Sequence, residues 1–290
     1  MKSSNPEALV SFAPDAGSSP MGGPILGLAL EELYSHYNRF EHIHPDPLEF
    51  VYLYDKKIDR ELSAFIASAL AYGRVRQILR SVRSVLDIMG PSPSSFLLEN
   101  RPADIREAFG FFKHRFTTGG VLSNLLVALR GLTLEYGSLE PCFLAGFSEH
   151  DPNILPALIE LVKKLEQACG RMMPTFLPSP DGGSACKRLN LFLRWMVRSD
   201  NVDPGIWQSI PASHLIVPLD IHMHRVAAAM GLTSRKQADI RCAVEITEVF
   251  SAIRPDDPVR YDFALTRLGI KPGTPPTKFF SSLLSIGGQG

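Results

Sequence analysis

The stretch VPLDIHMHRVAAAMGL, residues 217–232, is the most informative part of the chain for its fold. Pro218 cannot continue a preceding helix, and Asp220 stands two residues later, where a helix N-cap is expected. From Met223 to Met230 the apolar residues recur at helical spacing and form one stripe. The segment therefore predicts a helix that begins at Asp220, docks on a core through this stripe and ends near Met230.

Working outward from this helix, apolar residues recur at helical spacing along most of the chain, and no segment alternates as a strand does. The expected helices cover residues 25–38, 47–54, 58–72, 75–89, 94–99, 102–112, 120–136, 139–147, 153–168, 184–198, 220–230, 234–250 and 258–268. Turns rich in Pro and Gly separate them. The predicted fold class is all-α.

The chain is expected to hold one folded domain between two less ordered ends. Residues 1–23 mix Ser, Gly, Pro and Ala without periodicity, which is typical of a disordered leader. Residues 24–273 are expected to form a single helical domain, and residues 274–290 a tail. A Pro- and Gly-rich loop at 170–183 is expected to divide the domain into two subdomains.

Composition narrows the class of protein. The 290 residues carry 30 basic and 30 acidic side chains, and 45% are hydrophobic, which excludes a disordered chain and a polybasic coat for nucleic acid. No signal peptide or 18-residue apolar run is found, so we expect a cytoplasmic protein that does not bind membranes. The four cysteines are too widely spaced for a zinc or iron–sulfur motif, and we expect no metal and no cofactor.

Positive charge is concentrated in two segments. Residues 56–83 contain seven basic residues against two acidic ones, and residues 184–241 contain eight against four. Arg76, Arg80 and Arg83 share one helical face, which predicts contacts with several phosphates. The alternative is an ordinary solvated face.

Two histidines follow Asp220 and raise the question of a metal site. His222 and His224 stand two apart, so on a helix they point to nearly opposite sides and cannot converge with Asp220 on one ion. His222 and Arg225, three apart, do share a face close to the helix N-terminus, where anions are attracted. We expect these two residues to contact phosphate, with solvated surface as the alternative.

The stretch SACKRLNLFLRWMVR, residues 184–198, supplies a second candidate. Lys187 falls in the first turn of the expected helix, where the helix dipole disfavours an ammonium and favours a nucleophilic amine. Arg194 lies on the same stripe and is expected to contact DNA. Most lysines on helices are simply solvated, which is the alternative here.

The segment PLDIHMHRVA, residues 218–227, resembles the aspartate-bearing segment of the helix-hairpin-helix DNA glycosylase superfamily, and Asp220 matches its aspartate. The Gly-rich hairpin that usually precedes this segment is absent. The pattern is closest to the archaeal 8-oxoguanine glycosylase branch, which carries its lysine farther upstream, as Lys187 stands 33 residues before Asp220. Over residues 44–273 the chain looks like a bacterial family of uncharacterised proteins related to that superfamily. Further phrases that carry this resemblance are DPLEF at 46–50, DREL at 59–62, LAYGRV at 70–75, KRLNLFLRWMVR at 187–198 and YDFAL at 261–265.

The resemblance implies a glycosylase-like fold with a cleft between two helical subdomains, and a monomer that acts on damaged double-stranded DNA. It implies excision of a flipped-out base, an oxidised purine being the first candidate, with or without strand cleavage. Asp220 would stabilise an oxocarbenium-like sugar and Lys187 would form a Schiff base with it. Aromatic walls for the base are expected from Trp195, Trp207 and Tyr72. The alternatives are that these aromatics belong to the core, and that the chain is a non-catalytic DNA-binding module or a helical protein-interaction domain.

Overall fold

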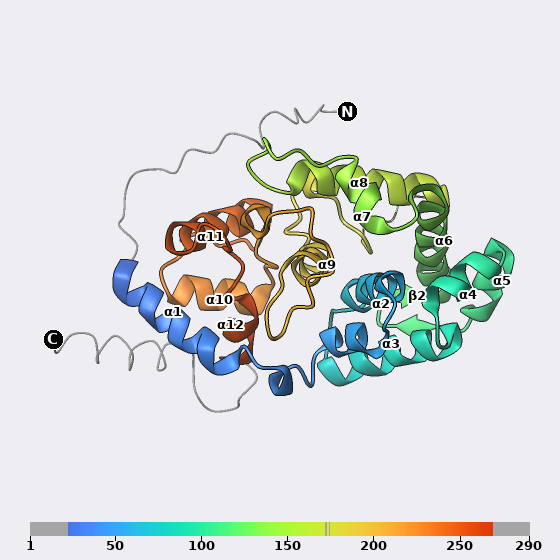
Figure 1. Ribbon diagram of the computed structural model, residues 1–290, viewed down its shortest axis with the longest axis horizontal. Coiled ribbons are helices and arrows are strands. Elements are labelled where there is room, and N and C mark those ends of the chain that lie inside the picture. Colours follow the sequence, from blue (N-terminus) through green and yellow to red (C-terminus); the bar gives the residue numbers. More distant parts are fainter. Residues whose placement is uncertain (1–22, 172, 174, 269–290) are drawn as a thin grey trace.

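Helices make up most of the structure (Figure 1), a computed structural model that describes residues 23–268 apart from 172 and 174. The predicted all-α class is confirmed. The expected leader and tail lie largely outside the described residues. Within the described part, no helix is both long and apolar enough to cross a membrane.

The helices form two groups on either side of α9 (Lys187–Val197) (Figure 1). On one side lie α1 (Gly23–Tyr37), α10 (Ile221–Ala229), α11 (Ile240–Ile253) and α12 (Asp262–Leu268). On the other side lie α2 (Lys57–Ala69), α3 (Val75–Met89), α4 (Pro93–Glu99), α5 (Pro102–Ala108), α6 (Gly119–Tyr136), α7 (Leu139–Leu144) and α8 (Leu155–Cys169). Short 3-10 turns are η2 (Phe40–His42), η3 (Pro47–Leu53), η4 (Pro180–Gly182) and η5 (Ala212–His214).

Several predicted boundaries are wrong, for local reasons. Residues 47–53 form a 3-10 helix capped by Asp46, not an α-helix. The helix expected over 234–250 begins only at Ile240, because the Asp239 side chain accepts a hydrogen bond from the Cys242 amide and caps it there. The helices expected over 58–72 and 102–112 end at residues 69 and 108, and the one expected over 258–268 is α-helical only from residue 262.

A small β-hairpin also contradicts the expectation that strands are absent. Its strands β1 (Lys113–His114) and β2 (Thr117–Thr118) pair antiparallel, with His114 opposite Thr117. Each strand is only two residues long, which is too short for the alternation of apolar and polar residues that predicts a strand.

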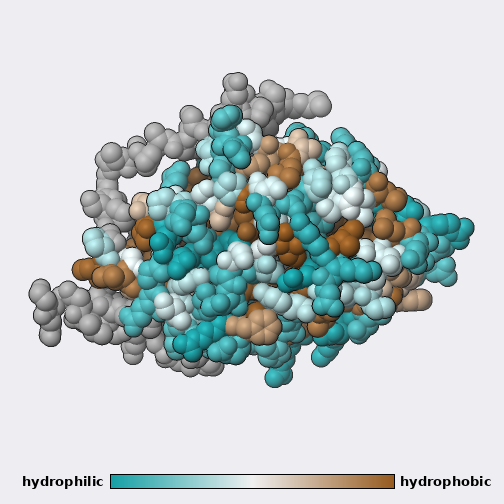
Figure 2. Space-filling model, in the orientation of Figure 1, coloured by the Kyte–Doolittle hydropathy of each residue, from teal (hydrophilic) through white to brown (hydrophobic). Residues whose placement is uncertain are grey.

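The core is centred on α2 and α9, which pack against each other. Almost every residue of both helices is buried, and the Phe65 and Phe192 rings meet edge to face with centroids 4.8 Å apart. The face of the molecule in Figure 2 is mostly hydrophilic, with hydrophobic residues scattered between polar ones. Because these two helices are held in the core, the residues at their ends have fixed positions.

α9 also buries charge. Arg194 donates to Asp203 at 2.9 Å and pairs with Asp262 of α12, while Arg198 pairs with Asp203 and donates to Asp257 at 2.8 Å. Arg194, Arg198, Asp203 and Asp262 are all less than 4% exposed. Such a network stabilises the fold only while every member is present, because an unpaired buried ion is costly.

We therefore expect Asp203→Asn to lower the free energy of unfolding by about 3–5 kcal/mol, since both guanidinium groups lose a buried partner. Urea denaturation measures the change. Lys163→Gln is the matched control: it removes an ion pair with Glu160 whose side chains are about half exposed, and should cost less than about 1 kcal/mol. Equal losses for the two variants would contradict the stabilising role of the network.

Candidate active site

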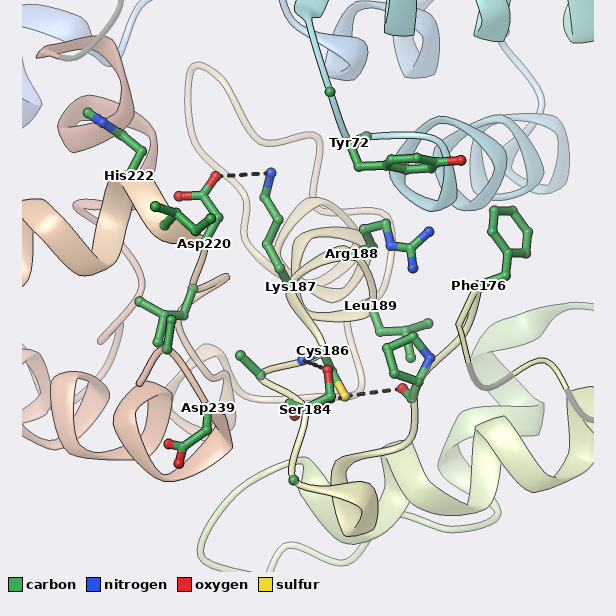
Figure 3. A pocket seen from close by; sticks show the side chains of 18 of the residues that line it. Tyr72, Phe176, Ser184, Cys186, Lys187, Arg188, Leu189, Asp220, His222 and Asp239 are labelled. Atoms are coloured by element: carbon green, nitrogen blue, oxygen red, sulfur yellow. Dashed lines mark hydrogen bonds and ion pairs between the residues drawn. The ribbon is translucent and has the colours of Figure 1, made fainter. Parts of the chain in front are cut away.

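α9 and α10 begin next to each other, and this brings Lys187 and Asp220 together. Lys187 is the first residue of α9, and Asp220 is the N-cap of α10, where its side chain accepts a hydrogen bond from the Met223 amide at 2.8 Å. Both local predictions, Lys187 in the first turn and a helix that begins at Asp220, are confirmed. The Lys187 Nζ lies 3.2 Å from Asp220 Oδ2 (Figure 3).

The start of α9 is set by the residues before it. Ser184 forms a bridge with Asp239, and its hydroxyl accepts a hydrogen bond from the Cys186 amide at 3.2 Å. Cys186 then adopts a left-handed conformation, with φ of 48°, which delays the helix until Lys187. No side chain caps the first turn of α9, so this helix end opens toward the neighbouring cleft with its amides uncapped.

The cleft has a volume of about 640 Å³ and receives residues from both groups of helices. This volume lies within the range of about 300–1,000 Å³ that is typical of ligand pockets. One wall comes from residues 71–73 and Phe176, the floor from 183–189 at the start of α9, and the opposite wall from 219–222 and 237–239 (Figure 3). Lys187 extends from the floor toward Asp220 on the opposite wall.

The charge of Asp220 is stabilised by its neighbours. Burial alone would raise the pKa of this carboxyl, but the Lys187 ammonium, the Met223 amide and His222 outweigh burial and hold the pKa below its usual value. The Asp220 side chain is 36% exposed, so a ligand in the cleft can reach it. The site therefore presents a permanent carboxylate beside an amine.

Arg188 adds a second cation to the cleft. Its guanidinium donates to the carbonyls of Ala69 at 2.9 Å and Thr175 at 3.0 Å, and lies 5.0 Å and 5.4 Å from the ring centres of Tyr72 and Phe176. Within the described residues no carboxylate pairs with it. Burial lowers the pKa of this group.

Cys186 also lines the cleft, but burial raises the pKa of its thiol to about 12. At neutral pH the group is therefore a thiol that donates to the Pro178 carbonyl, not a thiolate nucleophile. Lys187, whose side chain is 32% exposed, remains as the candidate nucleophile of the cleft.

The predictions for Trp195, Trp207 and Arg194 are wrong. Both tryptophans are buried in the core and do not line the cleft, and the Trp207 indole donates to the buried Glu61 carboxylate at 2.7 Å. Arg194 is 3% exposed and paired with Asp203 and Asp262, so it cannot meet a phosphate. The helix period identified one apolar face of α9, but α12 and the loop after α9 bury the other face as well.

The other predicted residues are at the surface or in the cleft. Tyr72 and His222 line the cleft, although Arg188 covers the Tyr72 ring, and His222 lies on the side of Asp220 away from Lys187 (Figure 3). Arg225 is exposed on α10. The three arginines predicted to meet phosphate, Arg76, Arg80 and Arg83, are exposed on α3.

Sequence reasoning missed Arg188 and Phe176. Arg188 follows Lys187 directly, and because consecutive helical residues point about 100° apart, both can border one cavity at a helix start. The place of Arg188 beside the cleft could therefore have been predicted from the sequence. Phe176 stands in the Pro-rich loop at 170–183, where no periodicity indicates which side chains turn inward.

Comparison with known proteins places the chain in a family. The model of the family described as "Protein of unknown function (DUF2400)" matches residues 46–271. Because the match covers most of the chain, the protein belongs to the DUF2400 family. No curated protein and no solved structure matches it.

The lowered pKa of Asp220 predicts how stability depends on pH. A carboxylate that is charged and paired in the folded state contributes fully above the ordinary Asp pKa of about 3.9, and this contribution is lost as pH falls through the lower folded pKa. Asp220→Asn keeps a good N-cap without the charge. We expect wild type to exceed this variant in free energy of unfolding by more at pH 6 than at pH 3, measured with urea.

The control is Asp181→Asn, which changes an exposed carboxylate without an ion pair in the described part of the chain. Its effect should be nearly the same at both pH values. A pH-independent difference between wild type and Asp220→Asn would contradict the assignment of charge at this site.

Proposed function

We propose that this protein is a DNA base-excision glycosylase with lyase activity, which removes a damaged base, in the first instance an oxidised purine, from double-stranded DNA. One observation carries the proposal: the amine of Lys187 and the carboxylate of Asp220 lie 3.2 Å apart in a cleft of ligand size. The resemblance of residues 218–227 to the aspartate-bearing segment of the helix-hairpin-helix glycosylases supports the same interpretation.

The Asp220 carboxylate stabilises the positive charge that develops on the sugar when the base departs. As the bond between C1′ and the base nitrogen breaks, the electron pair leaves with the base, and the sugar becomes positively charged at C1′ and its ring oxygen. Asp220 remains ionised, because its pKa is lowered, and is fixed by the Met223 amide. A preorganised negative charge at this place stabilises the transition state more than the ground state.

The amine serves as the nucleophile. In its neutral form Lys187 attacks C1′, and one of its protons passes to the departing base, which has gained the electron pair. Opening of the sugar ring then leaves an imine between Nζ and C1′, and this Schiff base permits cleavage of the strand. Because only the neutral amine carries a free electron pair, the ammonium form must release a proton before the attack.

The surface around the cleft suits a polyanion. Arg76, Arg80 and Arg83 are exposed on α3, which begins two residues after the cleft residue Gly73, and Arg225 is exposed on α10. An exposed guanidinium that neutralises a phosphate makes binding strongly dependent on salt.

The decisive experiment is borohydride trapping. Wild-type protein mixed with duplexes that contain 8-oxoguanine, uracil, hypoxanthine or an abasic site should release the base from at least one lesion, and borohydride should reduce the imine to a stable covalent adduct. Lys187→Gln should abolish the adduct. Asp220→Asn should slow base release by about 10²–10³-fold while leaving the fold intact.

Lys163→Gln, which removes an exposed lysine on α8, is the control and should form the adduct as wild type does. Base release without an adduct would overturn the role of Lys187 and leave Asp220 as the catalytic group. Salt-dependent binding of DNA without base release from any lesion would overturn the enzymatic proposal and favour a DNA-binding module.

A further inference from the structure

A short hairpin beside the cleft exposes two aromatic rings to solvent. We call residues 110–118, which contain β1 and β2, the aromatic hairpin. Phe111 precedes β1 and is fully exposed, and Phe116 in the two-residue turn is 85% exposed. No large hydrophobic side chain in the described part of the chain is more exposed than these two. Large apolar side chains exposed together and surrounded by polar residues can mark an interaction site.

The exposure does not come from a loose loop. His114 is buried, and its ring nitrogens lie 2.9 Å from the Ser81 hydroxyl of α3 and 3.1 Å from the Tyr72 carbonyl. At the end of the hairpin, the Gly119 backbone packs closely against the Phe109 carbonyl oxygen. A Cβ added to Gly119 would lie 2.0 Å from that oxygen. The base of the aromatic hairpin is therefore fixed while its tip is presented to solvent.

The same contacts attach the hairpin to the cleft. The Tyr72 hydroxyl donates to the His114 carbonyl at 2.8 Å and lies 2.6 Å from the Thr117 hydroxyl, and Tyr72 itself lines the cleft. The Arg115 side chain lies over Gly73, where its Cδ would be 2.7 Å from an added Cβ. Arg115 therefore lies beside Gly73, which lines the cavity that holds Lys187.

The sequence around the aromatic rings is locally basic. Residues 70–86 contain four arginines and no acidic residue, and residues 108–134 contain Lys113, Arg115 and Arg130 and again no acidic residue. The side chains of Lys113, Arg115 and the α3 arginines are exposed, and in the described part of the chain none of them pairs with a carboxylate. Aromatic faces set among unpaired cations fit a partner that offers planar rings and negative charge, which is the chemistry of nucleic acid.

We propose that the aromatic hairpin is a nucleic-acid contact, in which Phe111 and Phe116 stack on bases while Lys113 and Arg115 hold the adjoining phosphates. The choice of nucleic acid as the partner rests on the proposed function. An apolar side chain that enters a base stack parts neighbouring bases. Because the hairpin is fixed to Tyr72, a base displaced by Phe116 leaves the stack next to the cleft that contains Lys187 and Asp220.

The test compares Phe111→Ala/Phe116→Ala with wild type on a duplex that carries 2-aminopurine beside a mispaired base. Wild type should bind and raise the 2-aminopurine emission, because the base becomes unstacked. The double variant should bind at least about tenfold more weakly, by fluorescence anisotropy, and should lose the emission rise. Phe40→Ala, at a phenylalanine 60% exposed on η2, is the matched control and should behave as wild type.

Binding and unstacking need no bond cleavage, so this experiment is independent of the trapping experiment. Unchanged binding and emission in the double phenylalanine variant would overturn the role of the hairpin, even if wild type releases bases. Binding to phosphatidylserine vesicles through the same phenylalanines, without binding to DNA, would also overturn it.

Discussion

The buried charges of α9 fix the position of the candidate site. Arg194 and Arg198 lie in the core and are neutralised by Asp203 in the following loop and by Asp262 of α12. Because an unpaired buried guanidinium is costly, α9 is stable in one rotation about its axis and in one position along that axis. The first residue of the helix, Lys187, is therefore held at one place facing the start of α10.

Two helix N-termini meet at this place, and that arrangement determines the electrostatics. Each contributes a partial positive charge, and the Asp220 carboxylate accepts a hydrogen bond from the Met223 amide of one of them. Lys187 and Arg188 add full positive charges on the other side. For the proposed substrate, Asp220 and Lys187 would both lie at the reacting sugar carbon, and the positive charge around them would suit the neighbouring phosphates.

The sequence allowed local features to be predicted, but not distances between them. Capping rules located Asp220 at a helix start and Lys187 in a first turn, since each rule uses only neighbouring residues. The 3.2 Å contact between them depends on how α9 and α10 pack, which no local pattern contains. Arg194 and Trp195 were misplaced for the same reason, because helical periodicity identifies an apolar face but does not tell whether the polar face is buried too.

The neutral net charge of the chain is compatible with a locally basic surface, because the two kinds of charge are buried and distributed unequally. In the described part of the chain more carboxylates than guanidinium groups are buried, among them Glu61, which receives two amides and the Trp207 indole. Asp203 and Asp262 are balanced by buried arginines, whereas Glu61 is held by neutral donors and leaves a basic residue unbalanced elsewhere. The excess is found on α3 and the aromatic hairpin, which adjoin the cleft through Tyr72. Exposed positive charge is thereby placed near the Lys187–Asp220 pair, so a protein with no net charge can still attract a polyanion there.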